Sequence, residues 1–202
     1  MQTRALVQSG VAEEDGLRAH SYHLLARLLA EPPKGQLLEI VRGLAGDDTP
    51  FGQALETLAA AARKTTEGSL EEEYFQLFIG VGKSELLPYA SYYITGFLNE
   101  WPVAKLIDDM RALGVARADD VTEPEDHIAA LCETMAGLIT GAFGPAADLG
   151  AQKTFFETHV ANWAPNFFRD LEAAKSAAFY MPVGTLGRLF MEIEAEGFRM
   201  AA

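Results

Sequence analysis

The sequence has one cysteine, Cys132, among its 202 residues. A single thiol cannot form a disulfide within the chain, so we expect a core of apolar side chains to hold the fold together. A chain of this length buries roughly 70% of the surface that its unfolded form exposes. Cys132 stands in the apolar run 128-IAALCETMAGLI-139, which predicts a core thiol rather than a nucleophile. Such sparse cysteine usage is compatible with a reducing compartment.

Long apolar runs are also missing. No stretch reaches the roughly 18 consecutive apolar residues that a membrane-spanning helix needs. The first twenty residues lack the apolar region of a secretory signal, because Glu13, Glu14 and Asp15 interrupt it. We therefore expect a cytoplasmic protein with no membrane span.

Basic residues are few and scattered. The chain has 16 Lys and Arg against 29 Asp and Glu, for a formal net charge of -13. Contact with a nucleic-acid backbone is unfavourable for such a chain unless its basic side chains cluster. Only Arg63 and Lys64 are adjacent in the sequence. The composition argues against a nucleic-acid partner. The excess of acid suits either a basic partner or simple solubility.

Alanine and leucine are abundant, and apolar residues recur at spacings of three and four rather than alternating. This pattern predicts an all-α fold, which we expect to be a single-domain helical bundle over residues 1–202 with about eight to ten helices. The first helix should end near Ala30, before Pro32 and Pro33. Further helices are expected over 36–44, 49–63, 69–79, 94–113, from the 122–125 motif to about 142, 147–163, 165–178 and 180–196.

Three local signals refine these boundaries. Ser69 with Glu72 predicts a capping box for the helix over 69–79, and Thr122 with Glu125 predicts a second one. Pro102 predicts a bend inside the run 94–113. Residues 80–93 contain two glycines and a proline, so we expect a loop that re-enters a helix near Ser91, and residues 115–122 read as a polar link.

Motifs for catalysis or metal binding are weak. No Glu-x-x-His pair occurs, and His20 with His23 offers two ligands without companions, so no metal and no cofactor is predicted. The segment 80-GVGKS-84 matches only part of a phosphate-binding loop. It leaves a nucleotide-dependent switch, or an enzyme on the same helical fold, as the alternative hypothesis. No Gly-x-Ser-x-Gly turn is present.

Two segments favour peptide recognition instead. The stretch 73-EYFQLFIGVGKSELLPYASYY-93 is rich in aromatic side chains around a proline-containing loop, and tyrosine gives a large contact area with a polar tip. The stretch 119-DDVTEPEDH-127 holds five carboxylates in eight residues. Helix capping explains two or three of them, and carboxylates held close together suit the capture of guanidinium groups.

The same two segments resemble a known family. In order and spacing, the sequence is similar to TorD/DmsD/NarJ-type redox-enzyme maturation chaperones in three motifs, which are Glu73-Tyr74 with Leu77-Phe78, Pro88-Tyr89-x-Ser91-x-Tyr93, and Glu123-Pro124-Glu125-Asp126-His127. The Leu-Leu run of the first helix and the segment 155-FFETHVANWAPNFFRDL-171 extend the resemblance over nearly the whole chain.

The resemblance implies a cytoplasmic, non-enzymatic chaperone. Its partner would be the precursor of a molybdenum-cofactor oxidoreductase subunit, bound through its twin-arginine leader, its apo form, or both, until the cofactor is inserted. A relative that binds only the mature region of its client is a further alternative. The sequence does not identify which molybdenum-cofactor enzyme is the client. It also leaves the oligomeric state open, either a monomer or a helix-swapped dimer with a hinge in 115–122.

The resemblance also implies the site. Asp126, with Glu123 and Glu125, would pair the guanidinium groups of the leader, and His127 would orient Asp126 or donate to the peptide. Leu77, Phe78, Pro88 and Tyr89 would form an apolar floor. The peptide-binding residues expected on this basis are Tyr74, Leu77, Phe78, Pro88, Tyr89, Ser91, Tyr93, Glu123, Glu125, Asp126 and His127.

Overall fold

The computed structural model describes residues 13–117 and 123–201. Within these ranges the chain forms ten α-helices, one turn of π-helix and no β-strand, which confirms the predicted all-α class. The helices are α1 (Glu13–Ala30), α2 (Gly35–Arg42), α3 (Pro50–Arg63), α4 (Glu67–Tyr74), α5 (Ala90–Thr95), α6 (Trp101–Ala112), α7 (Ile128–Thr140), α8 (Leu149–His159), α9 (Ala164–Ala173) and α10 (Tyr180–Met200), and the π-helical turn η1 is Phe75–Ile79.

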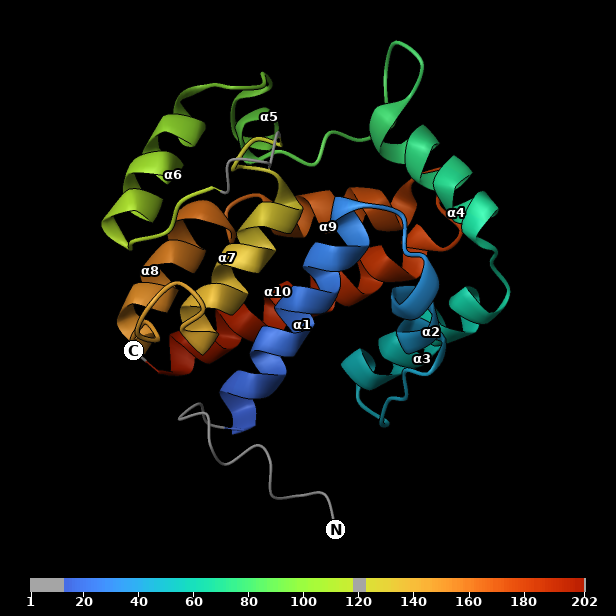
Figure 1. Cartoon of the computed structure of the whole chain (residues 1–202), viewed down its shortest axis with the longest axis horizontal. Coiled ribbons are helices and arrows are strands. Elements are labelled where there is room, and N and C mark those ends of the chain that lie inside the picture. The colour runs from blue at the N-terminus through green and yellow to red at the C-terminus, as the bar shows by residue number, and fades with distance from the viewer. Residues whose placement is uncertain (1–12, 118–122, 202) are drawn as a thin grey trace.

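The centre of the molecule is built from two helix pairs, α1 with α7 and α9 with α10 (Figure 1). Helix α7 is buried over most of its length and includes Cys132, whose pKa is raised by burial, so the predicted core thiol is confirmed. Helices α9 and α10 approach closely at Gly184, where an added Cβ would lie 2.5 Å from the backbone nitrogen of Glu172. Helices α2 and α3 pack together at one side.

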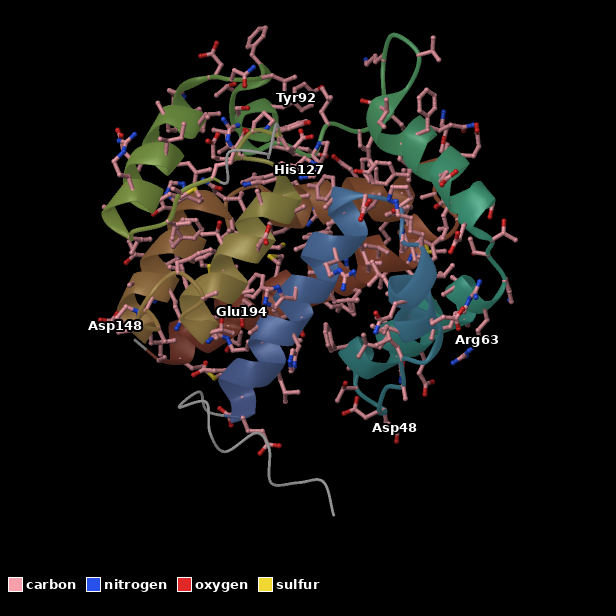
Figure 2. All side chains as sticks on the ribbon, viewed as in Figure 1. Asp48, Arg63, Tyr92, His127, Asp148 and Glu194 are labelled. Atoms are coloured by element: carbon pink, nitrogen blue, oxygen red, sulfur yellow. The ribbon has the colours of Figure 1, made fainter. Side chains whose placement is uncertain are left out.

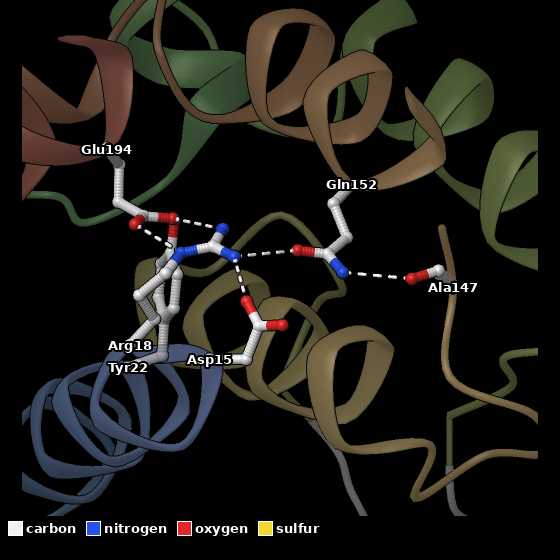
Figure 3. A network of polar contacts seen from close by, with 6 residues as sticks. All are labelled: Asp15, Arg18, Tyr22, Ala147, Gln152 and Glu194. Atoms are coloured by element: carbon white, nitrogen blue, oxygen red, sulfur yellow. Dashed lines mark hydrogen bonds and ion pairs between the residues drawn. The ribbon is translucent and has the colours of Figure 1, made fainter. Parts of the chain in front are cut away.

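A buried polar network joins α1, α8 and α10 (Figure 3). The guanidinium of Arg18 donates to both carboxylate oxygens of Glu194 at 2.7 and 2.9 Å, and the Tyr22 hydroxyl donates to Glu194 Oε2 at 3.0 Å. Burial by itself lowers the pKa of Arg18, but Glu194 and Asp15 outweigh that effect and raise it. Gln152 accepts a further hydrogen bond from Arg18 at 3.0 Å. These contacts fix α1 against the C-terminal helix.

The predicted helix over 69–79 differs from the observed one at both ends. Helix α4 begins at Glu67, and its capping box is formed by Thr66 and Ser69 rather than by Ser69 and Glu72. The α-helix gives way to the π-helical turn η1, which ends at Gly80 with a φ of 65°. That left-handed backbone suits glycine, which has no Cβ to clash.

The predicted run over 94–113 is two helices rather than one bent helix. Gly96 ends α5 in a left-handed conformation with a φ of 83°, and Asn99 follows with a φ of 59°. Pro102 lies in the first turn of α6, where its missing N–H leaves no hydrogen bond unmade. The proline therefore starts a helix instead of bending one.

The prediction that Thr122 and Glu125 form a second capping box is also wrong. Helix α7 begins at Ile128, and its N-cap is His127, whose Nδ1 accepts a hydrogen bond from the Ala129 backbone N–H at 3.1 Å. Glu125 therefore precedes the helix, while Thr122 and most of the predicted link lie outside the described residues. The last three helices occur where predicted, with α8 and α9 shorter and α10 longer than expected.

Across the described parts of the chain, no helix combines the length and the apolar character needed to cross a membrane.

Candidate peptide-binding site

The candidate site lies where two distant segments pair, between α4 and the α5–α6 pair along one edge of the molecule (Figure 1). Residues 88–90 run antiparallel to residues 126–128 in a short bridge. The Ala90 N–H donates to the Asp126 carbonyl at 3.0 Å, and the Ile128 N–H donates to the Pro88 carbonyl at 2.9 Å. This pairing brings together two of the motifs that the sequence singled out.

Asp126 is almost completely buried, with 1% of its surface exposed. Its Oδ2 accepts a hydrogen bond from the Ser91 backbone N–H at 2.8 Å, which satisfies a free donor in the first turn of α5. Its Oδ1 accepts no hydrogen bond from any residue that the structure describes. A buried carboxylate oxygen without a donor costs free energy, so a donor brought to this atom would be favourable, and an outside donor reaches it only when the residues around Asp126 move.

Glu123 lies exposed beside this buried acid and accepts a hydrogen bond from the Tyr89 hydroxyl. Burial, together with the charge and hydrogen bond of Glu123, raises the pKa of Tyr89 well above its ordinary value. Burial and the charges of Glu123 and Glu31 likewise raise the pKa of Tyr74 to about 12. Both tyrosines are therefore neutral donors in a field of negative sign.

His127 is a neutral ring in this site. Burial lowers its pKa, although Glu123 and Asp126 act in the opposite direction. The hydrogen bond that Nδ1 accepts from Ala129 requires that nitrogen to be unprotonated, which agrees with the neutral form. The ring meets Tyr89 edge-on, with centroids 5.2 Å apart. His127 thus holds the start of α7 and packs against the aromatic wall of the site.

Glu125 has a partner within the chain. Its Oε1 lies 3.4 Å from Nε of Arg117, whose Nη1 also donates to the Glu123 carbonyl at 3.3 Å. This pairing compensates one of the three carboxylates in the motif. The other two acids of the sequence cluster, Asp119 and Asp120, lie outside the described residues.

The predicted apolar floor is less accessible than the sequence suggested. Two of its residues, Leu77 and Pro88, are buried, and so is the neighbouring Ser91, so none of these three side chains presents an exposed surface to a peptide. Phe78 is half-buried and packs edge-on against Tyr74 at 4.9 Å.

Tyr74 and Tyr93 connect the site to its surroundings. The Tyr74 hydroxyl donates to the Ala30 carbonyl at 3.0 Å, at the end of α1. The Tyr93 hydroxyl donates to Asp170 Oδ2 at 2.9 Å, and its ring packs on Trp163. Tyr93 therefore faces α9 rather than the Asp126 cluster. The predicted peptide-binding residues thus do not form one group, because Tyr93 lies apart from those around Asp126.

Glu73 belongs to the first of the sequence motifs, but the sequence indicates no structural role for it. Its carboxylate accepts hydrogen bonds from three successive backbone N–H groups, those of Ala178, Phe179 and Tyr180, at 2.8, 3.1 and 2.7 Å. Glu73 thus caps α10 from a distance of more than a hundred residues along the chain. No local pattern around Tyr180 could have revealed this contact.

The geometry of the described residues supports neither nucleotide binding at residues 80–84 nor metal binding at His20 and His23. The segment Gly80–Ser84 follows a π-helical turn rather than a buried strand, so the architecture of a phosphate-binding loop is missing there. The Ser84 hydroxyl is used to donate to the Leu86 carbonyl at 2.8 Å. His20 and His23 are exposed on α1, and no cluster of three or more metal-ligating side chains occurs among the described residues.

Comparison with known proteins places this geometry in a family. The family model described as nitrate reductase delta subunit matches residues 44–169, which is more than half of the chain. The chain is 30% identical over 153 residues to a protein named chaperone protein TorD from Photobacterium profundum, covering 72% of this chain and 70% of that one. It is 28% identical over 186 residues to chaperone protein TorD from Vibrio vulnificus, covering 81% and 86%.

A solved structure shows the same fold. The crystal structure of a protein from Archaeoglobus fulgidus, described as a redox enzyme maturation protein, matches with a TM-score of 0.58 at 17% identity, over 90% of this chain and 94% of that chain. The relatives are named as chaperones and not as enzymes. The matched family, the named relatives and the helical fold agree with the motifs, and the chain belongs to the TorD/DmsD/NarJ-type family of redox-enzyme maturation chaperones.

Proposed function

We propose that this protein is a cytoplasmic, system-specific chaperone for a molybdenum-cofactor oxidoreductase. It binds the precursor of the catalytic subunit through the twin-arginine leader, with or without contacts to the apo enzyme, and delays export or assembly until the cofactor is inserted. Membership of a maturation-chaperone family supports the general role. The chemistry of the candidate site supports the leader as the ligand.

The observation that carries this proposal is the buried Oδ1 of Asp126, which has no donor among the described residues. A guanidinium presents five N–H donors in a planar fork and remains charged at any physiological pH. Inserting one of these donors would supply the hydrogen bond that Asp126 lacks. The exposed carboxylate of Glu123, which Tyr89 holds in the same site, would engage a second cation.

The surrounding electrostatics agree with a basic peptide. The chain carries a formal net charge of -13, which attracts a peptide with adjacent arginines. Exposed charge pairs contribute only about 1 kcal/mol each and weaken with salt, whereas a hydrogen bond to a charged buried group contributes about 1.5–3 kcal/mol. Most of the arginine selectivity should therefore come from Asp126.

The direct test is titration calorimetry at moderate salt with a synthetic peptide that carries two adjacent arginines followed by an apolar segment. Asp126→Asn keeps an oxygen for the Ser91 N–H but removes the charge. We expect it to lower the peptide affinity about ten- to a hundredfold, the equivalent of about 1.5–3 kcal/mol.

A matched control is available at Asp48, an exposed acid at the opposite edge of the molecule from His127 (Figure 2). Asp48→Asn changes the net charge by the same amount, so its peptide affinity should equal that of the wild type. Equal affinities for Asp126→Asn and Asp48→Asn would refute the assignment of Asp126.

The client itself is found by affinity purification of the tagged protein from its native cytosol, with mass spectrometry of the N-termini of co-purifying chains. A molybdoenzyme subunit that retains its leader is the expected result. Recovery of the subunit only without a leader would move the binding site to the mature fold and contradict the leader proposal.

A further inference from the structure

A hollow of about 340 Å³ lies where α6 and the residues that follow it meet the acidic motif 123–127. Its wall combines apolar side chains with charged ones. The lining includes Ile107, Met110, Arg111, Val115, Arg117 and Glu125. Apolar walls suit the methylene groups of a long side chain, and a carboxylate suits its cationic end. We call this feature the Glu125 hollow.

A guanidinium of the chain itself forms part of the Glu125 hollow. The Nε of Arg117 lies 3.4 Å from Oε1 of Glu125, and its Nη1 donates to the Glu123 carbonyl at 3.3 Å. Both acids belong to the motif that the proposed function assigns to leader arginines. The side chain of Arg117 is 42% exposed, whereas that of Glu125 is only 16% exposed. An internal guanidinium therefore stands where the acidic motif could hold one from a ligand.

The pair between Arg117 and Glu125 is looser than the other arginine–carboxylate pairs among the described residues. The closest N···O separations in those pairs run from 2.5 to 3.1 Å. At 3.4 Å, the contact of Arg117 exceeds the usual length of a hydrogen bond. A well-placed guanidinium donates two parallel hydrogen bonds to a carboxylate. Glu125 can therefore bind a better-oriented guanidinium than the one that Arg117 offers.

We infer that Arg117 is an internal substitute for a leader arginine, and that one arginine of the leader displaces it from Glu125 while the other binds Asp126. This inference rests on the proposed function. The exchange leaves Glu125 paired with a cation in both states and releases a side chain that is already part-exposed, so no buried charge is left without a partner. Arg117 thereby lowers the affinity for any peptide that must displace it.

A purely structural role for Arg117 predicts a different outcome. If the residue only holds the segment 115–117 against the acidic motif, its removal should lower the Tm and leave peptide binding unchanged or weaker. If Arg117 competes with the ligand, its removal should leave the Tm nearly unchanged, because an exposed pair stabilises little, and should tighten binding. The sign of the change in affinity separates the two roles.

The test is titration calorimetry at about 0.15 M salt, where exposed charges further apart than about 8 Å are largely screened. One synthetic peptide carries two adjacent arginines, and two others each have one of these replaced by glutamine. Arg117→Gln should bind the twin-arginine peptide about two- to fivefold more tightly than the wild type. Its affinity for the single-arginine peptides should be unchanged, since their remaining arginine is expected at Asp126.

Arg111→Gln is the matched control. This arginine lines the same hollow, is 72% exposed and pairs with Asp108 on its own helix, so its loss changes the charge equally without freeing Glu125. It should bind all three peptides within about twofold of the wild type. In a Glu125→Gln background, the further change Arg117→Gln should no longer alter the affinity.

Three results would overturn the inference: no gain for Arg117→Gln beyond that of Arg111→Gln, an equal gain with the single-arginine peptides, or a gain that persists without the carboxylate of Glu125. Failure of the wild-type protein to bind the twin-arginine peptide would instead refute the proposed function.

Nitrogen-15 NMR of the Arg117 side chain gives a second measurement, made on the unsubstituted protein. Its Nε–H resonance is assigned by its absence from the spectrum of Arg117→Gln. Saturation with the twin-arginine peptide should shift this resonance and speed its exchange with water, because the guanidinium leaves Glu125. The single-arginine peptides should not change it. A resonance that stays unchanged while the twin-arginine peptide is bound would show that Arg117 is not displaced.

Discussion

The buried ion pair between Arg18 and Glu194 allows a worked prediction for stability. Arg18→Met removes the two hydrogen bonds to Glu194, at 2.7 and 2.9 Å, together with those to Asp15 and Gln152, and leaves the carboxylate of Glu194 with Tyr22. Removing one partner of a buried pair costs about 3–5 kcal/mol. Because the Arg18 side chain is 20% exposed and water partly replaces it, we expect the lower end, about 3 kcal/mol. That loss corresponds to a fall in Tm of about 6–12 °C.

Urea unfolding followed by circular dichroism measures this effect. The double variant Arg18→Met with Glu194→Leu leaves no carboxylate of this pair buried and unpaired, so its loss should be smaller than the sum of the two single losses, although the buried Tyr22 hydroxyl then lacks its acceptor. Arg111→Met, which removes an exposed pair with Asp108, is the control and should unfold as the wild type does. A loss below about 1 kcal/mol for Arg18→Met, or additive losses in the double variant, would refute the reasoning.

Two further predictions concern capping and pH. Glu73→Ala removes the acceptor of three N–H groups at the start of α10 and should lower the free energy of unfolding by about 1–2 kcal/mol in thermal denaturation, whereas the exposed Glu72→Ala should not. Burial lowers the pKa of His127, so protonation of this ring favours the unfolded state. The free energy of unfolding should therefore be at its full value above about pH 6.5 and should fall as the pH decreases below it. His127→Asn keeps a capping acceptor but does not titrate, so its stability should fall less steeply between about pH 6.5 and 5; equal slopes would contradict the role of His127.

Much of the fold could be predicted from the sequence, because its signals act within a few residues. Two prolines after Glu31 stop a helix whatever surrounds them, and α1 does end at Ala30. Predictions from neighbouring residues were wrong where the sequence offered more than one possible start for a helix. Thr66 and Ser69 were both available as N-caps of one helix, and Pro102 could begin a helix or bend one.

The residue types of the candidate site were also predictable, since aromatics and carboxylates stand out in the sequence. Their accessibility was not. Asp126 is buried because residues 88–90 pair with residues 126–128, a contact between segments that lie far apart in the chain. Phe97 and Trp101 fit the period of a buried helix face, yet Gly96 and Asn99 turn the chain and leave both side chains exposed.

The sequence by itself determined the helical class, most helix boundaries and the chemistry of the two motifs, because these depend on hydrogen bonding and sterics between near neighbours. Only the tertiary structure decided that Asp126 has a buried oxygen without a donor, that Glu125 pairs with Arg117, and that Glu73 caps α10. Burial and pairing depend on which distant segments meet, and a pattern of near neighbours does not specify that meeting.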